Sequence, residues 1–529
     1  MKRTLLIFAL AILSLSCRKS EQEAPLPKAD LLSVSLNGKV VSLSSCPYGV
    51  DTETEIAFTF SKDVDLTRFD QNQLGCSGVN LSDFYLLAEG KQLTLKTNRP
   101  LPYFTKISLN FKSGENFGFE LADACRFSFI TAYNPSDKKE RLSDEQLFET
   151  VQKAAFSYFW DYGHPVSGLA RERLGSGNTV TTGGSGFGFM AIMVGVHRGW
   201  ISREEGAARV LKMARFIADK AAKYHGAFPH WLDGDSGQAI PFGTYDNGAD
   251  LVETALLMEG MLAAGEYFDA QTPDEQEYRA VLGQLWENIE WDWFRKDGEN
   301  RLYWHWSENY GWQMNLPVSG WNEALIVYVL AASSPTHPID KEVYDEGWAA
   351  GGNMSFDPNA PMFFAHYSFM GLDPRNLSDR YGNYWEVNCA HAQANWSYCA
   401  NSRKNYGYSS CCWGLTASDY YKGYTASSPA NDTGTIAPTA ALGSFPYLPQ
   451  QAQDAMEYFY YVLGDRLWGE YGFKDAFALK EQWFAESYIA IDQGPIVVMM
   501  ENYRSGLVWD SFMKNADIRQ GLSKLGFNY

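Results

Sequence analysis

The spacing of hydrophobic residues changes once along this chain, and that change constrains the fold more than any other feature. Between residues 31 and 132 apolar side chains recur at every second position, for example over 32–36 and 56–60. After a polar stretch at 133–142 they recur with the helical period of about 3.6 residues, beginning with a stripe that includes Leu147. A period of two is typical of strands, and the longer period is typical of helices. The sequence therefore predicts a multidomain protein, with an all-β domain followed by an all-α domain.

The β domain is predicted over residues 31–132. Several short alternating segments within about a hundred residues favour a small immunoglobulin-like sandwich. This region has no cluster of catalytic side-chain types, and all 17 Trp of the chain lie at or beyond Trp160. We expect it to be a spacer, and glycan binding is the alternative role.

The α domain is predicted over residues 143–529, after a linker at 133–142. Capping boxes at 143–146 and 202–205 open amphipathic helices. Between such helices lie segments that are apolar on nearly all sides, and these must be buried on all sides. Four such segments are clear and the last two are weaker: 187–194, 251–264, 324–331, 489–500, 387–396 and 436–442. Six of each kind would form the two concentric rings of an (α/α)6 barrel.

The first 17 residues predict a lipoprotein signal peptide. Lys2 and Arg3 precede a short apolar run that ends in small residues and Cys17. We expect acylation of Cys17, a flexible tether at 18–30, and an extracytoplasmic protein anchored to the outer membrane by lipid. The alternative is a plain secretory signal. The membrane face, periplasmic or external, stays open.

The charge of the chain limits its partners. Its formal net charge is -19, from 44 Lys and Arg against 63 Asp and Glu. This balance argues against nucleic acid, which needs a basic stripe, and disfavours anionic polysaccharides. Neutral glycans remain open. Phosphate-loop, HExxH and G-x-S-x-G motifs are absent from the sequence, so we expect no cofactor and no metal, and a monomer.

Acidic residues occur where the apolar helices begin. In a barrel of this kind the inner helices run parallel, so their N-termini share one end. Asp246, Asp250 and Glu253 are spaced to share one helical face, while Glu323 and Asp492 each precede an apolar run. Helix capping could explain Asp246 and Asp250. It explains Glu253 and Glu323 less well, because a carboxylate on an apolar helix needs a wet cavity.

Paired carboxylates in one cavity are typical of glycoside hydrolysis, in which one acts as general acid and the other as general base or nucleophile. Flat aromatic faces in the loops suit the C–H faces of sugar rings. The candidate catalytic residues are Glu323, Glu253, Asp250, Asp246 and Asp492. The candidate substrate-binding residues are His230, Trp231, Trp304, Trp306, Trp321, Trp385 and Arg171.

Six motifs spread over residues 143–520 resemble one family. They read SGLARER at 167–173, TTGGSGFG at 181–188, FPHW at 228–231, DNGADLVE at 246–253, GWNE at 320–323 and IDQGP at 491–495. This pattern resembles the glycoamylase-like proteins, in particular the endo-β-1,2-glucanases of glycoside hydrolase family 144. The resemblance implies an (α/α)6 barrel and inverting, metal-independent hydrolysis of β-1,2-glucan. It also implies that the acidic site residues are those of the D-x-x-x-D-x-x-E motif and Glu323.

The sequence thus predicts an inverting β-glucan hydrolase, most simply one acting on β-1,2-glucan to give sophoro-oligosaccharides. Glu323 is the expected general acid, and the base is either in the 246–253 stripe or Asp492. A non-catalytic glycan-binding lipoprotein and a glucoamylase-type α-glucan hydrolase remain alternatives, and a lyase or epimerase is a third. Linkage, chain length and endo or exo action stay open.

Overall fold

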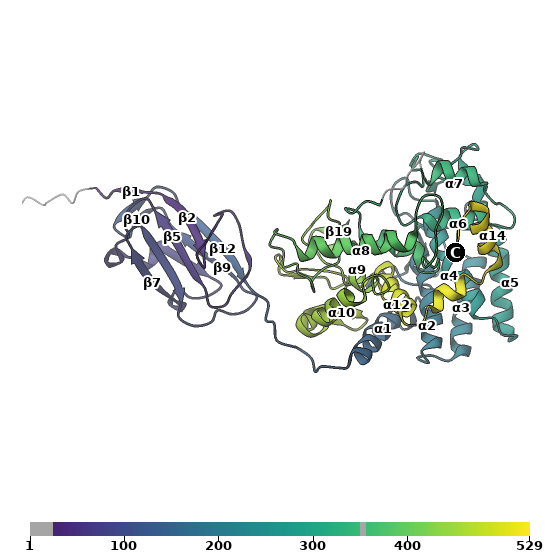
Figure 1. Cartoon of the computed structure of the whole chain (residues 1–529), viewed down its shortest axis with the longest axis horizontal. Coiled ribbons are helices and arrows are strands. Elements are labelled where there is room, and N and C mark those ends of the chain that lie inside the picture. Colours follow the sequence, from purple (N-terminus) through teal and green to yellow (C-terminus); the bar gives the residue numbers. More distant parts are fainter. Residues whose placement is uncertain (1–24, 350–355) are drawn as a thin grey trace, which may run out of the picture. The chain divides into compact units, whose positions relative to one another are not determined.

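The computed structural model describes residues 25–349 and 356–529 and is shown in Figure 1. The chain forms two compact units that divide between Ala132 and Tyr133. The predicted signal peptide with Cys17, and most of the predicted tether, lie outside the described residues. Among the described helices, none is long and apolar enough to cross a membrane.

The first unit is built of strands. Its five-stranded sheet has the order β3-β2-β5-β8-β7, its four-stranded sheet the order β4-β12-β9-β6, and a smaller sheet the order β1-β11-β10. The strands are β1 (Lys28–Ala29), β2 (Leu31–Leu36), β3 (Lys39–Val41), β4 (Tyr48–Val50), β5 (Glu55–Phe60), β6 (Leu74–Ser77), β7 (Phe84–Glu89), β8 (Gln92–Thr97), β9 (Lys106–Phe111), β10 (Gly114–Asn116), β11 (Phe119–Leu121) and β12 (Cys125–Thr131).

The two larger sheets of this unit pack face to face. The ring of Phe58 on β5 lies 4.9 Å from that of Phe111 on β9 and 6.2 Å from that of Phe127 on β12. These side chains belong to one buried cluster drawn from both sheets. Alternate residues of each strand enter it, as a period of two requires.

The second unit is mainly helical. Its α-helices are α1 (Asp144–Trp160), α2 (Thr182–His197), α3 (Arg203–Asp219), α4 (Leu251–Tyr267), α5 (Pro273–Glu287), α6 (Leu325–Ser333), α7 (Lys341–Gly347), α8 (Tyr384–Ala400), α9 (Pro438–Leu442), α10 (Pro449–Glu457), α11 (Gly464–Leu467), α12 (Ala490–Arg504), α13 (Leu507–Phe512) and α14 (Ala516–Leu525). Its short strands are β13 (Thr179–Thr181), β14 (Trp231–Asp233), β15 (Ala239–Ile240), β16 (Ala249–Asp250), β17 (His305–Trp306), β18 (Ala417–Tyr420), β19 (Gly423–Ala426), β20 (Trp468–Gly469), β21 (Gly472–Phe473), β22 (Phe477–Ala478) and β23 (Trp483–Phe484).

Four helices that are buried on nearly all sides form the interior of this unit. Helix α2 packs against α4 and α12, and α4 packs against α6. The contact between α2 and α4 needs two glycines, because a Cβ built on Gly260 would lie 1.9 Å from the carbonyl oxygen of Gly186. The amphipathic helices α1, α3, α5 and α14 each pack against one of these four. The apolar segments predicted at 187–194, 251–264, 324–331 and 489–500 are therefore interior helices.

Helix α8 differs from the prediction for residues 387–396. It buries one face only, and Glu386 in its first turn is exposed. The buried face is polar: Asn388 donates to the Tyr447 hydroxyl at 3.1 Å, and Asn395 donates to the Leu415 carbonyl at 3.0 Å. Its apolar residues were too few for burial on all sides.

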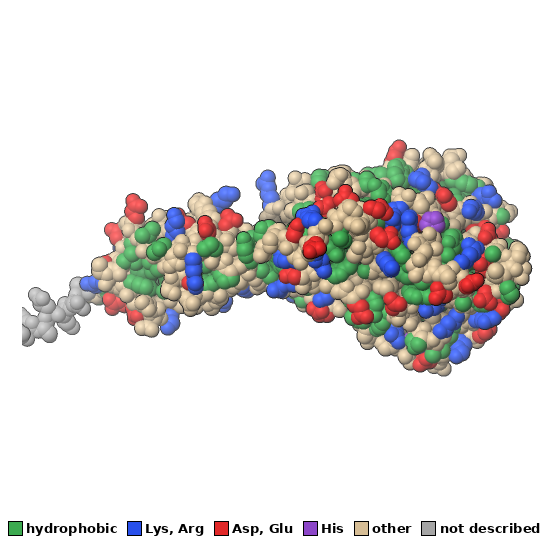
Figure 2. Space-filling view, turned by 90° about the horizontal axis from the view of Figure 1, so that it is seen from below, with side chains coloured by type: hydrophobic (Ala, Val, Ile, Leu, Met, Phe, Trp, Pro, Cys, Tyr) green, Lys and Arg blue, Asp and Glu red, His purple; other side chains and the backbone are tan. Residues whose placement is uncertain are grey.

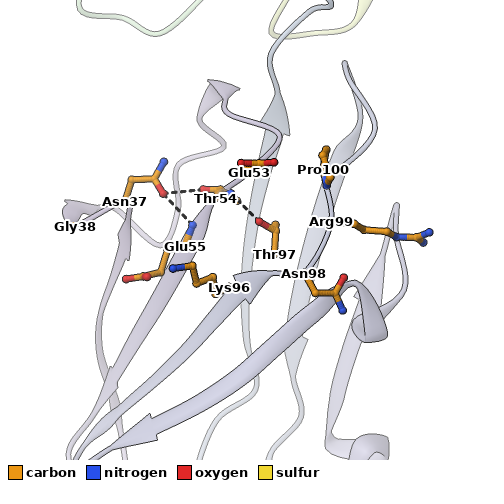
Figure 3. A pocket seen from close by; sticks show the side chains of 10 residues that line it. All are labelled: Asn37, Gly38, Glu53, Thr54, Glu55, Lys96, Thr97, Asn98, Arg99 and Pro100. Atoms are coloured by element: carbon orange, nitrogen blue, oxygen red, sulfur yellow. Dashed lines mark hydrogen bonds between the residues drawn. The ribbon is translucent and has the colours of Figure 1, made fainter.

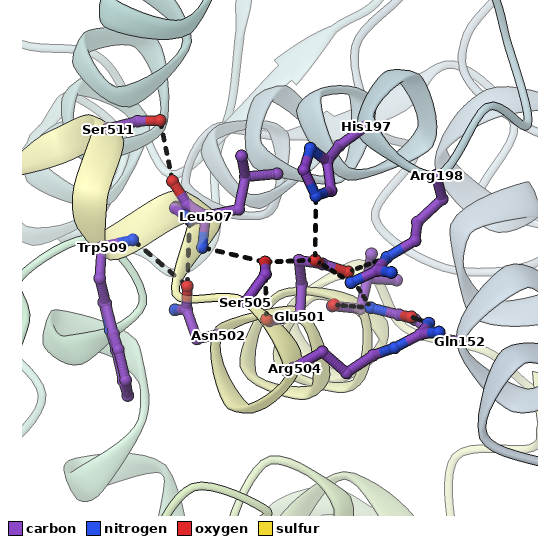
Figure 4. A network of polar contacts seen from close by, with 12 residues as sticks. Gln152, His197, Arg198, Glu501, Asn502, Arg504, Ser505, Leu507, Trp509 and Ser511 are labelled. Carbon is purple, nitrogen blue, oxygen red and sulfur yellow. Dashed lines mark hydrogen bonds and ion pairs between the residues drawn. The ribbon is translucent and has the colours of Figure 1, made fainter. Parts of the chain in front are cut away.

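A buried ion pair ties the C-terminal end of α12 to α1 and α2. Glu501 is fully buried and accepts hydrogen bonds from Arg198, from the Gln152 amide at 3.1 Å and from the Ser505 hydroxyl at 2.6 Å. Figure 4 shows these side chains pointing toward the Glu501 carboxylate. Arginine holds the pKa of Glu501 below its usual range despite burial, which by itself raises it. This network fixes three helices at the end of α12 opposite to Asp492.

The face shown in Figure 2 carries acidic and basic side chains that are interspersed, with apolar side chains scattered among them. That arrangement is ordinary for a water-exposed surface.

Candidate active site

A cavity of about 410 Å³ lies beside the N-terminal ends of α2, α4, α6 and α12. Glu253 comes from the first turn of α4, and Glu323 lies two residues before α6. The lining also includes Glu172, Arg173, Thr181, His230, Trp231, Phe242, Phe363, Tyr367, Ala417, Tyr424, Ala426, Ile489 and Ile491. The structure thus brings together two carboxylates that are 70 positions apart in the sequence.

The β unit has a larger but different hollow, of about 740 Å³ (Figure 3). Its lining is polar and has no aromatic residue. The side-chain oxygen of Asn37 accepts hydrogen bonds within the sheet from the Thr54 hydroxyl at 3.2 Å and from the Glu55 N–H at 2.9 Å. The hollow has exposed acids but no buried pair of them, so the cavity of the helical unit is the better candidate for a catalytic site.

Glu253 is held by the helix that crosses next to it. Its Oε2 accepts a 2.7 Å hydrogen bond from the backbone N–H of Gly183, and its Oε1 lies 3.7 Å from Nε2 of His230. A Cβ on Gly183 would come within 2.8 Å of Oε2, so only glycine allows this approach. Burial raises the pKa of Glu253; the nearby His230 partly offsets this effect, and Asp250 adds to it.

Glu323 is positioned by the start of α6. The Ser368 hydroxyl donates to the Glu323 carbonyl oxygen and accepts from the Ile326 N–H at 3.0 Å, which fixes the entry to the helix. Burial raises the pKa of the Glu323 carboxyl to about 7, and the negative charges of Asp250 and Glu253 contribute to the rise. A carboxylic acid with such a pKa is still partly protonated at neutral pH, as a general acid requires.

Asp246 and Asp250 face two histidines behind Glu253. One oxygen of Asp250 caps α4 by accepting the N–H groups of residues 252 and 253, each at 3.0 Å. Its other oxygen lies 3.2 Å from Nδ1 of His230 and 3.2 Å from Nε2 of His305. The same His305 nitrogen lies 3.1 Å from Asp246 Oδ2. Neither aspartate is among the residues that line the cavity.

Both histidines of this cluster are cations at neutral pH. Burial lowers the pKa of His230, but Glu253 and Asp250 outweigh it and raise that pKa to about 9. For His305 burial is likewise outweighed by Asp250 and Asp246, which raise its pKa to about 10. Burial alone would raise the pKa of Asp250, but the two imidazolium groups hold it well below its usual range. Each aspartate of the cluster thus lies beside a histidine whose pKa is raised.

The same cluster is the one place, within the described residues, where side chains gather closely enough for a metal ion. Ligand atoms of His230, Asp246 and Asp250 all lie within 4.8 Å of one another. Nε2 of His305, however, already lies 3.1 and 3.2 Å from Asp246 Oδ2 and Asp250 Oδ2. These two oxygens therefore already have a histidine partner.

Asp492 lies in the first turn of α12, fully buried beside the cavity wall formed by Ile489 and Ile491. Its carboxyl faces that of Asp475, and the two can be joined only by a shared proton. Burial, followed by the neighbouring Asp475, raises the pKa of Asp492 well above its usual range. Burial also raises the pKa of Asp475, to about 7. Burial and the facing Asp475 carboxyl thus disfavour the ionised form of Asp492, and Asp492 does not line the cavity.

Arg173 lines the cavity and is engaged by two carboxylates. Its Nε lies 2.8 Å from Glu172, and its Nη1 lies 2.9 Å from Asp419 on β18. Asp419 also accepts from the Ser487 hydroxyl at 2.5 Å. These contacts tie the β18–β19 hairpin, which carries Tyr424, to the cavity wall.

Of the predicted substrate-binding residues, His230 and Trp231 line the cavity. The other five lie elsewhere in the structure. Trp304 stacks on His305, Trp306 packs edge-on against Trp293, Trp321 donates to His391, Trp385 packs edge-on against Tyr447, and Arg171 lies over the Tyr162 ring.

Several cavity residues were missed from the sequence. Phe242 stacks on His230 with ring centroids 4.0 Å apart, but it lies in a loop whose sequence carries no recognisable motif. Tyr424 lies on strand β19, outside every helix that the sequence predicts. Arg173, which lines the cavity, lies in the SGLARER motif, and His305, which lies behind the cavity, is the residue between Trp304 and Trp306. The position of His305 between two aromatic residues was a signal that could have been used.

Comparison with known proteins gives concordant results. The Glycoamylase family model matches residues 315–516. An exo β-1,2-glucooligosaccharide sophorohydrolase from Parabacteroides distasonis is 42% identical over 420 residues, or 73% of this chain. The chain spans 58% of the length of that curated relative.

Two solved structures extend this similarity. The endo-β-1,2-glucanase of Chitinophaga pinensis is 48% identical, with a TM-score of 0.71 over 74% of this chain and 99% of that one. A β-1,2-glucanase of Parabacteroides distasonis is 35% identical, with a TM-score of 0.71 over 95% of this chain and 74% of that one. This chain therefore belongs to the glycoamylase-like family of β-1,2-glucanases, glycoside hydrolase family 144.

Proposed function

We propose that this protein is an inverting glycoside hydrolase that cleaves β-1,2-glucan to sophoro-oligosaccharides. The observation that carries the proposal is the single cavity lined by Glu253, from the first turn of α4, and Glu323, from the segment just before α6. The names of the relatives, which are β-1,2-glucan hydrolases, support the choice of substrate.

The proposal includes the finer architecture and the location. We infer that residues 143–529 form an (α/α)6 barrel and that residues 31–132 are an immunoglobulin-like spacer. The four interior helices with their outer partners support the first inference, and the two facing sheets support the second. The lipobox-like sequence at Cys17 supports lipid anchoring to the outer membrane, with the protein acting as a monomer.

In the proposed reaction Glu323 is the general acid. Its carboxyl gives a proton to the glycosidic oxygen as the bond between that oxygen and the anomeric carbon breaks. A water molecule attacks the anomeric carbon from the opposite face, and Glu253 accepts the proton that this water loses. Inversion requires the two carboxyl groups to be about 6.5–9.5 Å apart so that the water fits between them.

Glu253 is a better base than the other acids. Asp246 and Asp250 are occupied by histidine N–H groups and stay outside the cavity lining. Burial and the neighbouring Asp475 raise the pKa of Asp492 well above its usual range, and Asp492 is not part of the cavity lining. Glu253 has one oxygen held by a backbone N–H and the other directed at His230, in contact with the cavity.

The cavity wall suits a neutral sugar. Trp231 and Phe242 pack edge-on with ring centroids 4.9 Å apart, and Phe242 remains half exposed. Aromatic faces of this kind bind the C–H faces of pyranose rings. Their position next to Glu253 supports a subsite for a glucosyl unit.

The test is hydrolysis by the full chain and by Glu323→Gln. Linear β-1,2-, β-1,3-, β-1,4- and α-1,4-glucans are incubated with each, and new reducing ends are counted. We expect cleavage of β-1,2-glucan, a loss of at least about 10³-fold in Glu323→Gln, and no loss in the exposed control Glu386→Gln. NMR of the first products should show the α-anomer. Unaltered turnover in Glu323→Gln, or cleavage of α-1,4-glucan alone, would refute the proposal.

A further inference from the structure

His305 has its position set by the backbone. Strands β16 and β17 form a two-residue antiparallel ladder in which Asp250 is the direct partner of His305. The ladder continues into α4, because the Leu251 N–H donates to the Trp304 carbonyl at 2.8 Å. This backbone pairing places His305 beside the first residues of α4.

One nitrogen of His305 holds both aspartates. Nε2 lies 3.1 Å from Asp246 Oδ2 and 3.2 Å from Asp250 Oδ2. His230 reaches Asp250 at 3.2 Å but Asp246 only at 3.8 Å. His305 is thus the close partner of Asp246 in this cluster, and all three of His305, Asp246 and Asp250 are buried.

Asp246 in turn closes the turn that carries Phe242. The Asp246 carbonyl accepts the N–H groups of Phe242 at 3.0 Å and of Gly243 at 3.2 Å. The Phe242 ring stacks on His230 with an interplanar angle of 11°. His230 then presents Nε2 to Glu253 at 3.7 Å, while its Nδ1 stays on Asp250.

From this chain of contacts, and resting on the proposed function, we infer that His305 is a positioning residue for the reaction. By pinning Asp246 and Asp250 with one N–H it leaves His230 free to face Glu253, and it fixes the turn that places Phe242 on the cavity wall. His305 lies outside the D-x-x-x-D-x-x-E motif and does not line the cavity. It acts on the reaction only through these neighbours.

Removal of His305 has a defined consequence. Two buried carboxylates are left with one imidazolium, so His230 is drawn toward Asp246 and away from Glu253. The groups that face the vacated position are Asp246, Asp250 and His230, with Glu253 next to them. Less positive charge beside these acids raises the pKa of Glu253, so more of the base is protonated at a given pH.

The experiment compares His305→Ala and His305→Gln with the wild-type chain on β-1,2-glucan. His337→Ala is the matched control, because that histidine also pairs with an aspartate, Asp292 at 3.2 Å, but is only partly buried and lies outside this cluster. We expect His305→Ala to lower kcat about 100-fold, as a misplaced catalytic group does, and to raise KM by a smaller factor, because the shifted turn carries Phe242. The acidic limb of its pH profile should move to higher pH. His305→Gln, which keeps a donor without the charge, should recover part of kcat, and the control should equal wild type.

A crystal structure of His305→Ala gives a readout that needs no activity. We expect the Phe242–Asp246 turn to shift and His230 to leave Glu253. If kcat and the pH profile of His305→Ala match wild type, or if the turn and His230 keep their places, the positioning role is wrong. If the wild-type chain cleaves no glucan, the proposed function fails, and the crystal structure alone then decides the role of His305.

Discussion

The pKa of Glu323 sets a basic limit to the reaction. Burial places this pKa near 7 instead of 4.5. Only enzyme with Glu323 protonated is active. The protonated fraction of Glu323 is half at pH 7, about 9% at pH 8 and about 91% at pH 6. With an ordinary pKa the fraction at pH 7 would be about 0.3%, so burial increases the usable acid by roughly 150-fold.

The assay is kcat/KM on β-1,2-glucan from pH 5 to pH 9 at constant ionic strength. We expect a basic limb with a midpoint near pH 7 and a tenfold fall for each further pH unit, a slope of one proton. Residual activity in Glu323→Gln should lack this limb, because the amide does not titrate. A profile that stays flat to pH 9, or the same limb in Glu323→Gln, would show that Glu323 is not the acid.

Three further predictions concern the base, the close approach and the fold. Glu253→Gln should lower kcat by on the order of 10³-fold, and Asp492→Asn should lower it by less than about tenfold. Both are measured by the release of reducing ends. A larger loss in Asp492→Asn than in Glu253→Gln would indicate that Asp492 is the base. Gly183→Ala should lower kcat, because the added Cβ would lie 2.8 Å from Glu253 Oε2. Circular dichroism should show that the fold of this variant is intact. Gly283→Ala is the control and should keep full activity, because a Cβ there has no atom within 4 Å. Glu501→Gln should reduce the free energy of unfolding in urea by about 1.5–3 kcal/mol, because the charge-assisted hydrogen bonds to the buried carboxylate are weakened. A loss below about 0.5 kcal/mol would contradict this explanation.

The positions of the interior helices in the second unit were predictable, because a helix that is buried on all sides has a mostly apolar sequence. Helices α2, α4, α6 and α12 are buried on nearly all sides, and each overlaps a mostly apolar segment predicted on that ground. The capping boxes at Ser143 and Ser202 also form, with side chains and N–H groups paired in both directions. These features depend only on neighbours within one helix.

The candidate site was predictable only in part, since its geometry depends on pairs far apart in the chain. Glu253 and Glu323 were found because each stands alone on an apolar helix start. Trp304 and Trp306 were selected by residue type, yet the β16–β17 ladder turns the intervening His305 toward Asp250. No local pattern reveals such a register. The same holds for Tyr424, whose hairpin is tied to the cavity by Asp419.

The pairing of Arg173 has a consequence for which sugars this cavity can accept. It is the one Lys or Arg among the residues described as lining the cavity, and its guanidinium is already shared between Glu172 and Asp419. A uronate entering here would bring a further negative charge toward Glu253 and Glu323. The two basic residues of the lining, Arg173 and His230, already lie beside carboxylates. We therefore expect the cavity to disfavour acidic saccharides and to accept neutral glucosyl chains, whose hydroxyls need no counter-ion.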